Sequence, residues 1–233
     1  MRRISKTLFR DRTQVGKLLA ERVLKAKISN PIVLAIPRGG VPVAKEIALA
    51  LRSKLDLVIT RKIGFPGQPE FAIGAVAQDG ELIVDEEVIR SYGISKEYLK
   101  EESARQRKEI EERMKKYRGN ATLPDLKGQT VIIVDDGIAT GNTVLAAVKS
   151  VRKQNPAGII LAVGVAPKET IARLSSSVNK IICLESPEPF YAIGQFYEEF
   201  NQVQDDEVKS ILAEVNFGVK NAGPHLSEKA RGT

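Results

Sequence analysis

The chain has 233 residues, enough for one sizeable α/β domain with a single core but with little room for two. Its 42% hydrophobic and 28% charged residues are typical of a globular protein and exclude wholesale disorder. The formal charge of +7 predicts an anionic partner, and because no basic segment is interleaved with aromatic rings, a phosphorylated metabolite is favoured over nucleic acid.

Helices and strands are predicted to alternate from the N-terminus. Apolar side chains recur at helical spacing over residues 15–26, after a candidate N-cap at Thr13. The apolar run at 32–36, closed by the Gly-rich residues 37–40, is typical of a strand buried on both faces, and a helix follows directly. Residues 55–60 predict a second strand.

The middle of the chain predicts a loop, a hairpin and a long helix. Residues 64–70 are dense in Gly and Pro, which indicates a mobile loop. Two short apolar runs, 75–77 and 82–84, flank an Asp-Gly pair and predict a hairpin. Residues 95–117 are charged with a thin apolar stripe, so we expect a long, largely solvated helix; a partner-binding helix is the alternative.

The C-terminal half predicts further strands and helices in alternation. A third core strand is expected at 130–134 and a helix packed on the sheet at 143–151. The remaining elements are strands at 158–165 and 180–184, a helix at 169–174 between them, an aromatic-bearing stretch at 190–200 and a helix at about 205–215. Because strands alternate with helices, the fold class is predicted to be α/β, with a parallel sheet flanked by helices on both faces.

Three features argue against other classes of protein. The lone Cys183 lies in an apolar run and is predicted to be a buried small hydrophobe rather than a nucleophile. No run approaches the ~20 apolar residues of a membrane span, and none follows the charged residues 1–6, so we expect a cytoplasmic protein with no membrane partner. Residues 216–233 are predicted to fray, and His225 within them is not expected to be catalytic.

Two adjacent carboxylates, Asp135 and Asp136, follow the third core strand, at the end of the sheet where α/β proteins bind ligands. Vicinal ribose hydroxyls or a hard divalent cation would offset their mutual repulsion. The small residues that follow run into a helix, so their backbone N–H groups and the hydroxyls of Thr140 and Thr143 predict a cradle for one phosphate. The segment lacks the Gly-Lys-Ser/Thr ending of a P-loop and the three-glycine dinucleotide fingerprint.

Residues 131–143, VIIVDDGIATGNT, resemble the motif with which type I phosphoribosyltransferases bind 5-phosphoribosyl 1-pyrophosphate (PRPP). That motif consists of an apolar strand, two acids, a short spacer and Thr-Gly-x-Thr. Residues 37–40 look like the pyrophosphate loop of the family, and Arg61 and Lys62 lie where the second strand is predicted to end beside the same group. The resemblance covers most of residues 32–184.

The resemblance implies a donor site made of three parts. Asp135 and Asp136 would hold the ribose 2- and 3-hydroxyls, with Mg²⁺ bound, directly or indirectly, between hydroxyls and pyrophosphate. The 5-phosphate would be wrapped by residues 139–143, namely Ala139, Thr140, Gly141, Asn142 and Thr143. The pyrophosphate would be held by backbone amides of Arg38, Gly39 and Gly40, in a loop that in this family often carries a cis peptide.

Arg61 and Lys62 would neutralise the departing pyrophosphate, so the candidate catalytic residues are Asp135, Asp136 and Lys62. The alternative interpretation of Arg61 and Lys62 is two surface charges at a strand end. Ala139 stands where a purine-handling subgroup carries a third acid, which argues against hypoxanthine or guanine as the acceptor.

Other residues are candidates for meeting the acceptor. Glu70, Asp79 or Glu81 could supply a carboxylate in place of the missing acid. An aromatic residue of the C-terminal segment, Tyr191 first or Phe190, could stack on the acceptor.

Residues 1–215 are predicted to form one phosphoribosyltransferase-like domain, with a lid and helical insertion at 64–120, a hood at 185–203 and a flexible tail at 216–233. The expected activity is transfer of the 5-phosphoribosyl group from PRPP to a nitrogen acceptor, such as a nucleobase, with release of pyrophosphate. The main alternative is a PRPP-binding sensor without turnover, followed by a PRPP hydrolase or synthetase-like protein. A homodimer is expected by resemblance.

Overall fold

A computed structural model describes residues 7–119 and 124–221 of the chain. Its centre is a five-stranded sheet in the order β2-β1-β6-β7-β8, in which every neighbouring pair is parallel. The strands are β1 (Pro31–Ala35), β2 (Leu55–Leu57), β6 (Thr130–Gly137), β7 (Gly158–Val165) and β8 (Lys180–Glu185). The prediction of a parallel sheet flanked by helices is therefore confirmed.

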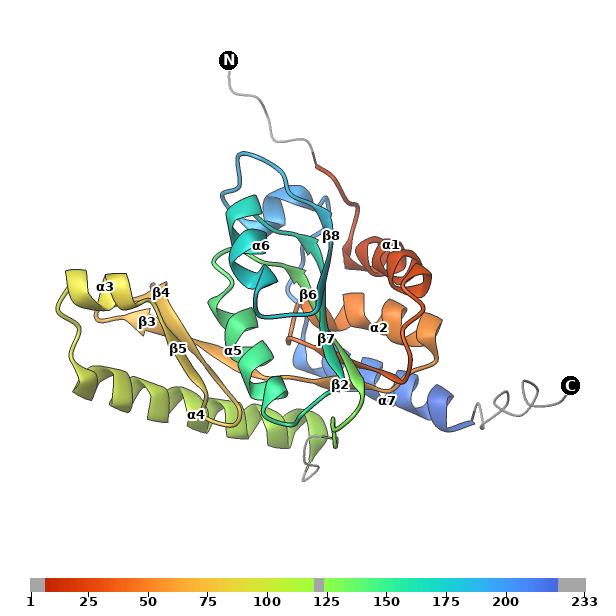
Figure 1. The fold of residues 1–233 in the computed structure, drawn as a ribbon, viewed down its shortest axis with the longest axis horizontal. Helices are drawn as coiled ribbons and strands as arrows, with labels where there is room; N and C mark the ends of the chain where they lie inside the picture. The colour runs from red at the N-terminus through yellow and green to blue at the C-terminus, as the bar shows by residue number, and fades with distance from the viewer. Residues whose placement is uncertain (1–6, 120–123, 222–233) are drawn as a thin grey trace, which may run out of the picture.

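Helices cover both faces of this sheet (Figure 1). One face carries α1 (Arg12–Lys25), α2 (Gly40–Leu51) and α7 (Asp205–Asn221), and the other carries α5 (Asn142–Arg152) and α6 (Lys168–Ser175). Alternate residues of β6 enter different cores: Ile132 and Val134 pack in one cluster, Val131 and Ile133 in the other. Because both faces are buried, β6 reads as an uninterrupted apolar run.

Residues 60–118 form an arm that projects from the parallel sheet (Figure 1). The arm contains an antiparallel sheet in the order β3-β4-β5, made by β3 (Thr60–Phe65), β4 (Gln68–Ala77) and β5 (Leu82–Val84), followed by α3 (Glu86–Ser91) and α4 (Lys96–Arg118). The β4–β5 hairpin and the long helix were predicted from the sequence, and both are confirmed.

Two predictions for the start of the arm are wrong. The single strand expected at 55–60 is divided, because β2 ends at Leu57 in the parallel sheet and β3 begins at Thr60 in the antiparallel one. The mobile loop expected at 64–70 is a β3–β4 hairpin with Phe65 paired to Gln68. Pro66 presets the backbone for the turn, and Gly67 takes the left-handed conformation, at φ +77°, that such a turn requires.

The predicted start of α1 and the predicted end of α7 are also corrected. The N-cap of α1 is Asp11, whose carboxylate accepts a hydrogen bond from the backbone N–H of Gln14, and Thr13 lies inside the helix. Helix α7 continues to Asn221 instead of fraying after 215, since the Asn216 side chain exchanges two hydrogen bonds with the backbone of Leu55. The rest of the predicted tail, including His225, lies outside the described residues.

Arg118 and Ser95 hold the two ends of α4. The Ser95 hydroxyl caps the helix by accepting from the backbone N–H of Tyr98. At the other end Arg118, which is 4% exposed, pairs with Asp56 and donates to the carbonyl of Leu57. Helix α4 is thereby anchored on β2. No helix among the described residues is long and apolar enough to cross a membrane.

Candidate functional site

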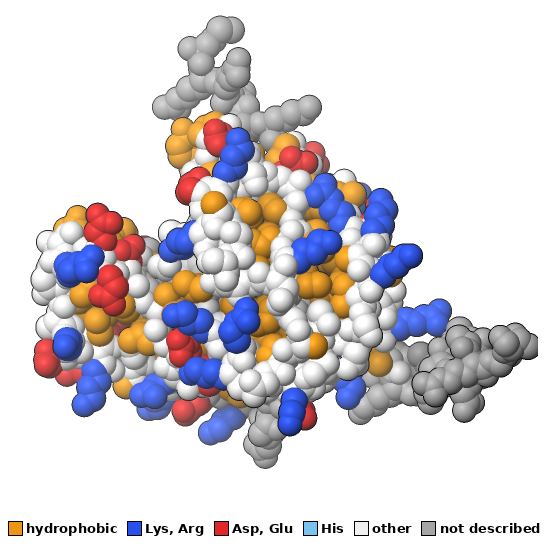
Figure 2. Space-filling model, in the orientation of Figure 1, with side chains coloured by type: hydrophobic (Ala, Val, Ile, Leu, Met, Phe, Trp, Pro, Cys, Tyr) orange, Lys and Arg blue, Asp and Glu red, His pale blue; other side chains and the backbone are white. Residues whose placement is uncertain are grey.

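A cavity of about 680 Å³ lies between the C-terminal ends of β1 and β6 and the arm. The parallel sheet contributes residues 36–37 and 135–141, together with Thr143. The arm contributes residues of β3, of β4 and of one side of α4, and the C-terminal segment contributes Ile193. In the space-filling view the surface is hollowed between the arm and the body, and Lys and Arg side chains are scattered over this face rather than gathered in one block (Figure 2).

The two carboxylates border this cavity but lie in different environments. Strand β6 ends at Gly137, so Asp135 and Asp136 lie inside the strand, directly before its last residue, and not in the following loop. Asp136 is 5% exposed, whereas Asp135 is half-buried and accepts a hydrogen bond from the backbone N–H of Asp136 at 2.9 Å. Burial, followed by the negative charge of Asp136, raises the pKa of Asp135 well above its usual range.

Arg12, at the start of α1, forms an ion pair with Asp136, with 2.7 Å between Nε and Oδ2. The same guanidinium donates to the backbone carbonyl of Asn201 at 2.7 Å and lies 4.0 Å above the centre of the Phe200 ring. Sequence reasoning assigned Arg12 no role. Nothing local could have indicated one, because its partner lies 124 residues away.

The predicted phosphate cradle is a turn that leads into α5. Gly141, at φ +77°, is the N-cap residue, and a Cβ there would meet the Thr170 side chain at 3.0 Å. Ala139 and Thr140 are exposed and Thr143 is half-buried, and all three line the cavity. Their backbone and hydroxyl groups thus lie at a helix N-terminus that opens into the cavity.

Two side chains of α6 form hydrogen bonds with this turn and with the start of α5. The Thr170 hydroxyl donates to the carbonyl of Ala139 at 2.7 Å, and Arg173 donates to the Asn142 side chain at 3.2 Å. Asn142 is buried and does not line the cavity. Of the five predicted phosphate residues, Ala139, Thr140, Gly141 and Thr143 therefore border the cavity.

The predicted pyrophosphate loop packs directly on the two acids. The peptide bond between Pro37 and Arg38 is cis. A Cβ on Gly39 would lie 2.2 Å from Oδ2 of Asp136, and one on Gly40 would lie 2.5 Å from the carbonyl oxygen of Val134. Glycine is therefore required at both positions by close approach to β6. Pro37 lines the cavity, whereas the Arg38 side chain lies 3.6 Å from Asp205 of α7.

Arg61 and Lys62 lie within β3, not at the end of a strand of the parallel sheet as predicted, and both line the cavity. Arg61 donates to the Gln106 side chain and pairs with Glu109, both on α4. Burial and the positive charge of Arg113 lower the pKa of Arg61. The Lys62 side chain has no hydrogen bond or ion pair to another described residue.

One side of helix α4 forms a wall of the cavity, a position that the prediction of a long, largely solvated helix did not include. The wall consists of side chains at helical spacing: Glu102, Arg105, Gln106, Glu109 and Arg113. Glu102 accepts hydrogen bonds from Arg105 and Gln106, and Gln106 in turn accepts from Arg61. These polar residues recur at intervals of three, four and seven in the sequence, a spacing that places them on one face but does not show whether that face meets water or a cavity.

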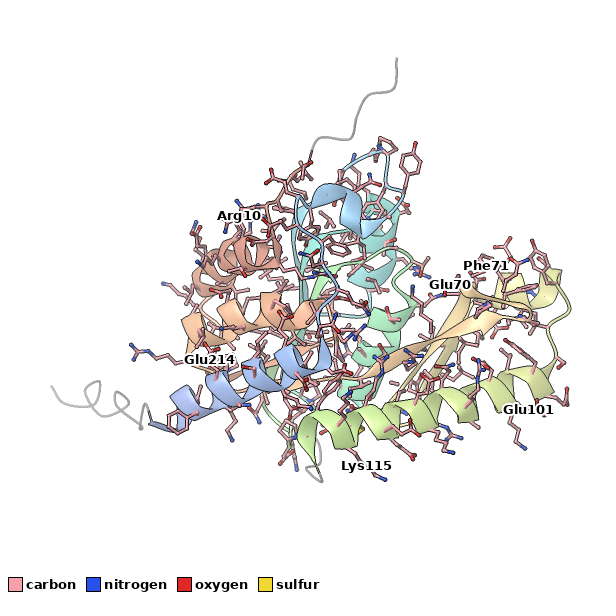
Figure 3. The ribbon with its side chains drawn as sticks, turned by 180° about the vertical axis from the view of Figure 1, so that it is seen from behind. Arg10, Glu70, Phe71, Glu101, Lys115 and Glu214 are labelled. Atoms are coloured by element: carbon pink, nitrogen blue, oxygen red, sulfur yellow. The ribbon has the colours of Figure 1, made fainter. Side chains whose placement is uncertain are left out.

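The acceptor candidates divide between the cavity and other surfaces. Glu70 lines the cavity, and Figure 3 places it with Phe71 on the side of the arm toward the body. Asp79 and Glu81 instead pair with Lys153, the residue that follows α5, at 2.9 and 2.8 Å.

The C-terminal segment reaches the cavity through one aliphatic side chain. Ile193, at the start of the 3₁₀ helix η1 (Ile193–Phe196), lines the cavity and packs against Gly137. The two aromatic candidates are not among the lining residues. Phe190 packs on Phe196, with 4.9 Å between ring centres, and Tyr191 is 83% exposed. A stacking role for either ring stays a prediction.

Cys183 is unpaired and partly buried against the core on the α5 and α6 side. Burial raises the pKa of its thiol, which opposes formation of the nucleophilic thiolate.

The chain is similar to phosphoribosyl transferases along most of its length. A family model described as a phosphoribosyl transferase domain matches residues 10–201. Two Mycobacterium tuberculosis proteins, of strains CDC 1551 / Oshkosh and ATCC 25618 / H37Rv, are provisionally named phosphoribosyl transferases and are 37% identical to it over 216 residues. The match covers 93% of this chain and 49% of each relative, so the chain spans about half the length of the curated relatives it matches.

Two solved structures share its fold. The crystal structure of TT1426 from Thermus thermophilus has a TM-score of 0.75 and 41% identity, and the match covers 89% of this chain and 98% of that one. A hypothetical protein from Neisseria gonorrhoeae, solved with bound ppGpp, has a TM-score of 0.50 and 14% identity, with 89% and 96% of the two chains covered.

Proposed function

The chain belongs to the phosphoribosyl transferase family, and from this premise we propose that it transfers the 5-phosphoribosyl group of PRPP to a nitrogen acceptor, with release of pyrophosphate. One observation carries the proposal: the phosphate cradle at Thr140 and Thr143, the carboxylate of Asp135 and the cations Arg61 and Lys62 all border the same cavity. PRPP presents a phosphate, which would suit the hydroxyls of Thr140 and Thr143, and vicinal hydroxyls, which would suit the carboxylate of Asp135. Its pyrophosphate would suit the cations Arg61 and Lys62.

The proposed reaction forms a bond between the acceptor nitrogen and C1 of the ribose as the bond from C1 to the pyrophosphate oxygen breaks, with the electron pair leaving on pyrophosphate. Negative charge therefore grows on the leaving group while positive charge grows on the sugar. Arg61, fixed by Glu109 and Gln106, and the unpaired Lys62 would stabilise the leaving group. Asp135 would offset the positive charge on the ribose.

Magnesium fits this site only together with its ligand. The described residues hold no group of three or more His, Cys, Asp or Glu side chains placed to bind a metal. Mg²⁺ commonly uses one or two carboxylates and takes its other oxygens from water and substrate phosphates. Asp135 borders the cavity and forms no ion pair with a described residue, so it is the carboxylate that would hold such a cation. When bound, Mg²⁺ would neutralise part of the pyrophosphate charge.

Ligand-dependent melting tests the donor half of the proposal. PRPP with Mg²⁺ should raise the melting temperature, because a ligand that binds only the folded state stabilises it. The substitution Asp135→Asn should abolish this shift. The matched control Asp206→Asn, at a side chain 91% exposed on α7, should keep it. An unaltered melting temperature at millimolar PRPP would contradict the proposal.

Pyrophosphate release across a panel of purines, pyrimidines and other nitrogen compounds tests the transfer half. Release that depends on one acceptor supports a transferase and identifies that acceptor. A PRPP sensor without turnover is the second candidate, and it is favoured by the position of Phe190 and Tyr191 outside the cavity lining. It predicts a melting shift with PRPP and no release with any acceptor. Release with water alone would instead indicate a hydrolase.

A further inference from the structure

The ion pair between Arg12 and Asp136 is nearly buried and lies beside the proposed donor site. The two side chains are 12% and 8% exposed. An exposed ion pair adds little to the stability of a protein. In a buried pair each partner depends on the other, because removal of one leaves the charge of the other buried without compensation. The pair therefore constrains how Asp136 can act.

Three further contacts fix both partners. The guanidinium of Arg12 is held by the carbonyl of Asn201 and stacks on Phe200. The backbone carbonyl of Asp136 accepts a hydrogen bond from the Tyr197 hydroxyl at 2.6 Å. Residues 197–201 and the start of α1 thus hold Asp136 at its carboxylate and at its backbone.

The Asp136 carboxylate also packs against the predicted pyrophosphate loop. The same oxygen that pairs with Arg12 lies where a Cβ on Gly39 would be 2.2 Å away, so it packs against the backbone of that loop. The Asp135 carboxylate is more exposed: it is half-buried, and it accepts a hydrogen bond from the backbone N–H of Asp136.

We propose that Arg12 is a positioning residue of the donor site: it neutralises and holds Asp136, so that Asp135 is the acid left to meet the ribose hydroxyls of PRPP. This inference rests on the proposed function. Without Arg12, Asp136 becomes a nearly buried charge with no cation beside it, which favours a shift of its side chain and of the end of β6. Such a shift weakens binding of PRPP without removing any group that touches it.

Calorimetric titration of the full chain with PRPP in the presence of Mg²⁺ measures this effect. Arg12→Gln should weaken binding at least about tenfold, which corresponds to about 1.4 kcal/mol. Arg12→Lys keeps the charge and should restore part of the affinity. The matched control is Arg10→Gln, because Arg10 is 64% exposed, lies at the outer end of the molecule near α1 (Figure 3) and pairs only with Asp11 among the described residues.

A double-mutant cycle tests whether Arg12 acts through Asp136. In the Asp136→Asn background, Arg12→Gln should cost clearly less affinity than it does in the unaltered chain, because the charge that it compensates is gone. If Arg12→Gln fails to fold, Arg12→Lys takes its place in the cycle, since it also loses the guanidinium geometry.

The outcomes separate the two proposals. If the unaltered chain does not bind PRPP, both the proposed function and the role of Arg12 are overturned. If the unaltered chain binds PRPP and the Arg12 variants bind it equally well, only the role of Arg12 is overturned. Equal losses of affinity with and without the Asp136 carboxylate also overturn it, because they show that Arg12 acts by another route.

Discussion

Asp205 joins the arm to the body, and its substitution by Asn should destabilise the protein in a pH-dependent way. Asp205 is the first residue of α7 and accepts hydrogen bonds from Lys116 and Tyr117 at the end of α4, and it lies 3.6 Å from Arg38. These hydrogen bonds, with the charge of Lys116, lower the pKa of Asp205 to about 2. Burial and the Asp205 carboxylate raise the pKa of Tyr117 to about 12.

The size of the effect follows from the pKa of Asp205. A fall from 3.8 to about 2 corresponds to about 2.4 kcal/mol, and because the side chain is 29% exposed, solvent screening reduces this to about 1–2 kcal/mol. Since the pKa is lower in the folded state, the contribution is fully present above the unfolded pKa, near pH 4. It is lost as the pH falls through about 2.

Urea denaturation at several pH values between 3 and 7 checks this prediction. Asp205→Asn should lower the free energy of unfolding by about 1–2 kcal/mol at pH 7, and the difference from the unaltered chain should shrink by pH 3. The matched control is Asp206→Asn, one residue along the same helix, where the side chain is 91% exposed and pairs with Lys209. Equal losses for the two variants, or a difference that does not shrink in acid, would refute the reasoning.

Three further substitutions probe the anchor of the arm and the two loops of the site. Arg118→Met removes one partner of a nearly buried ion pair, so urea denaturation should show a loss of about 3–5 kcal/mol, whereas Lys108→Met on the exposed side of α4 should cost much less. Gly40→Ala places a Cβ about 2.5 Å from the Val134 carbonyl oxygen, so the melting temperature should fall by the equivalent of about 1–3 kcal/mol; unchanged melting would show that the loop is not packed on β6. Thr143→Val removes a hydroxyl from the proposed phosphate cradle and should weaken PRPP binding by about 1.5–3 kcal/mol in calorimetry; unaltered affinity would exclude that contact.

The parallel sheet and the turn before α5, which we propose as a phosphate cradle, could be located because their signals are local. Strands buried on both faces are uninterrupted apolar runs, so the sequence locates β1, β6 and β7 within a few residues, and the short apolar run 181–184 locates the edge strand β8. The small residues before α5 likewise lie together in the sequence. The β3–β4 hairpin also had a local signal, Pro66-Gly67, but a Pro-Gly pair is equally common in loops, and only pairing of the flanking strands distinguishes the two.

The composition of the cavity depended on contacts between distant residues. Asp79 and Glu81 were as plausible as Glu70 from the sequence, and packing of the β4–β5 hairpin on α5 turned both toward Lys153. The charged helix α4 became a wall because Arg118 anchors its end on β2 and Arg61 meets Gln106 across the arm. A polar helical stripe looks the same in sequence whether it faces water or a ligand.

The sequence by itself determined the fold class and the position of the segment that we propose binds PRPP, since both follow from hydrophobic periodicity and from small residues next to one another along the chain. Only the tertiary structure decided how the two acids differ. Asp135 and Asp136 are equivalent in the sequence, but the alternation of β6 sends their side chains to opposite faces of the sheet. Both acids border the cavity, but Asp136 pairs with Arg12 on the face that α1 covers, whereas Asp135 forms no ion pair with a described residue.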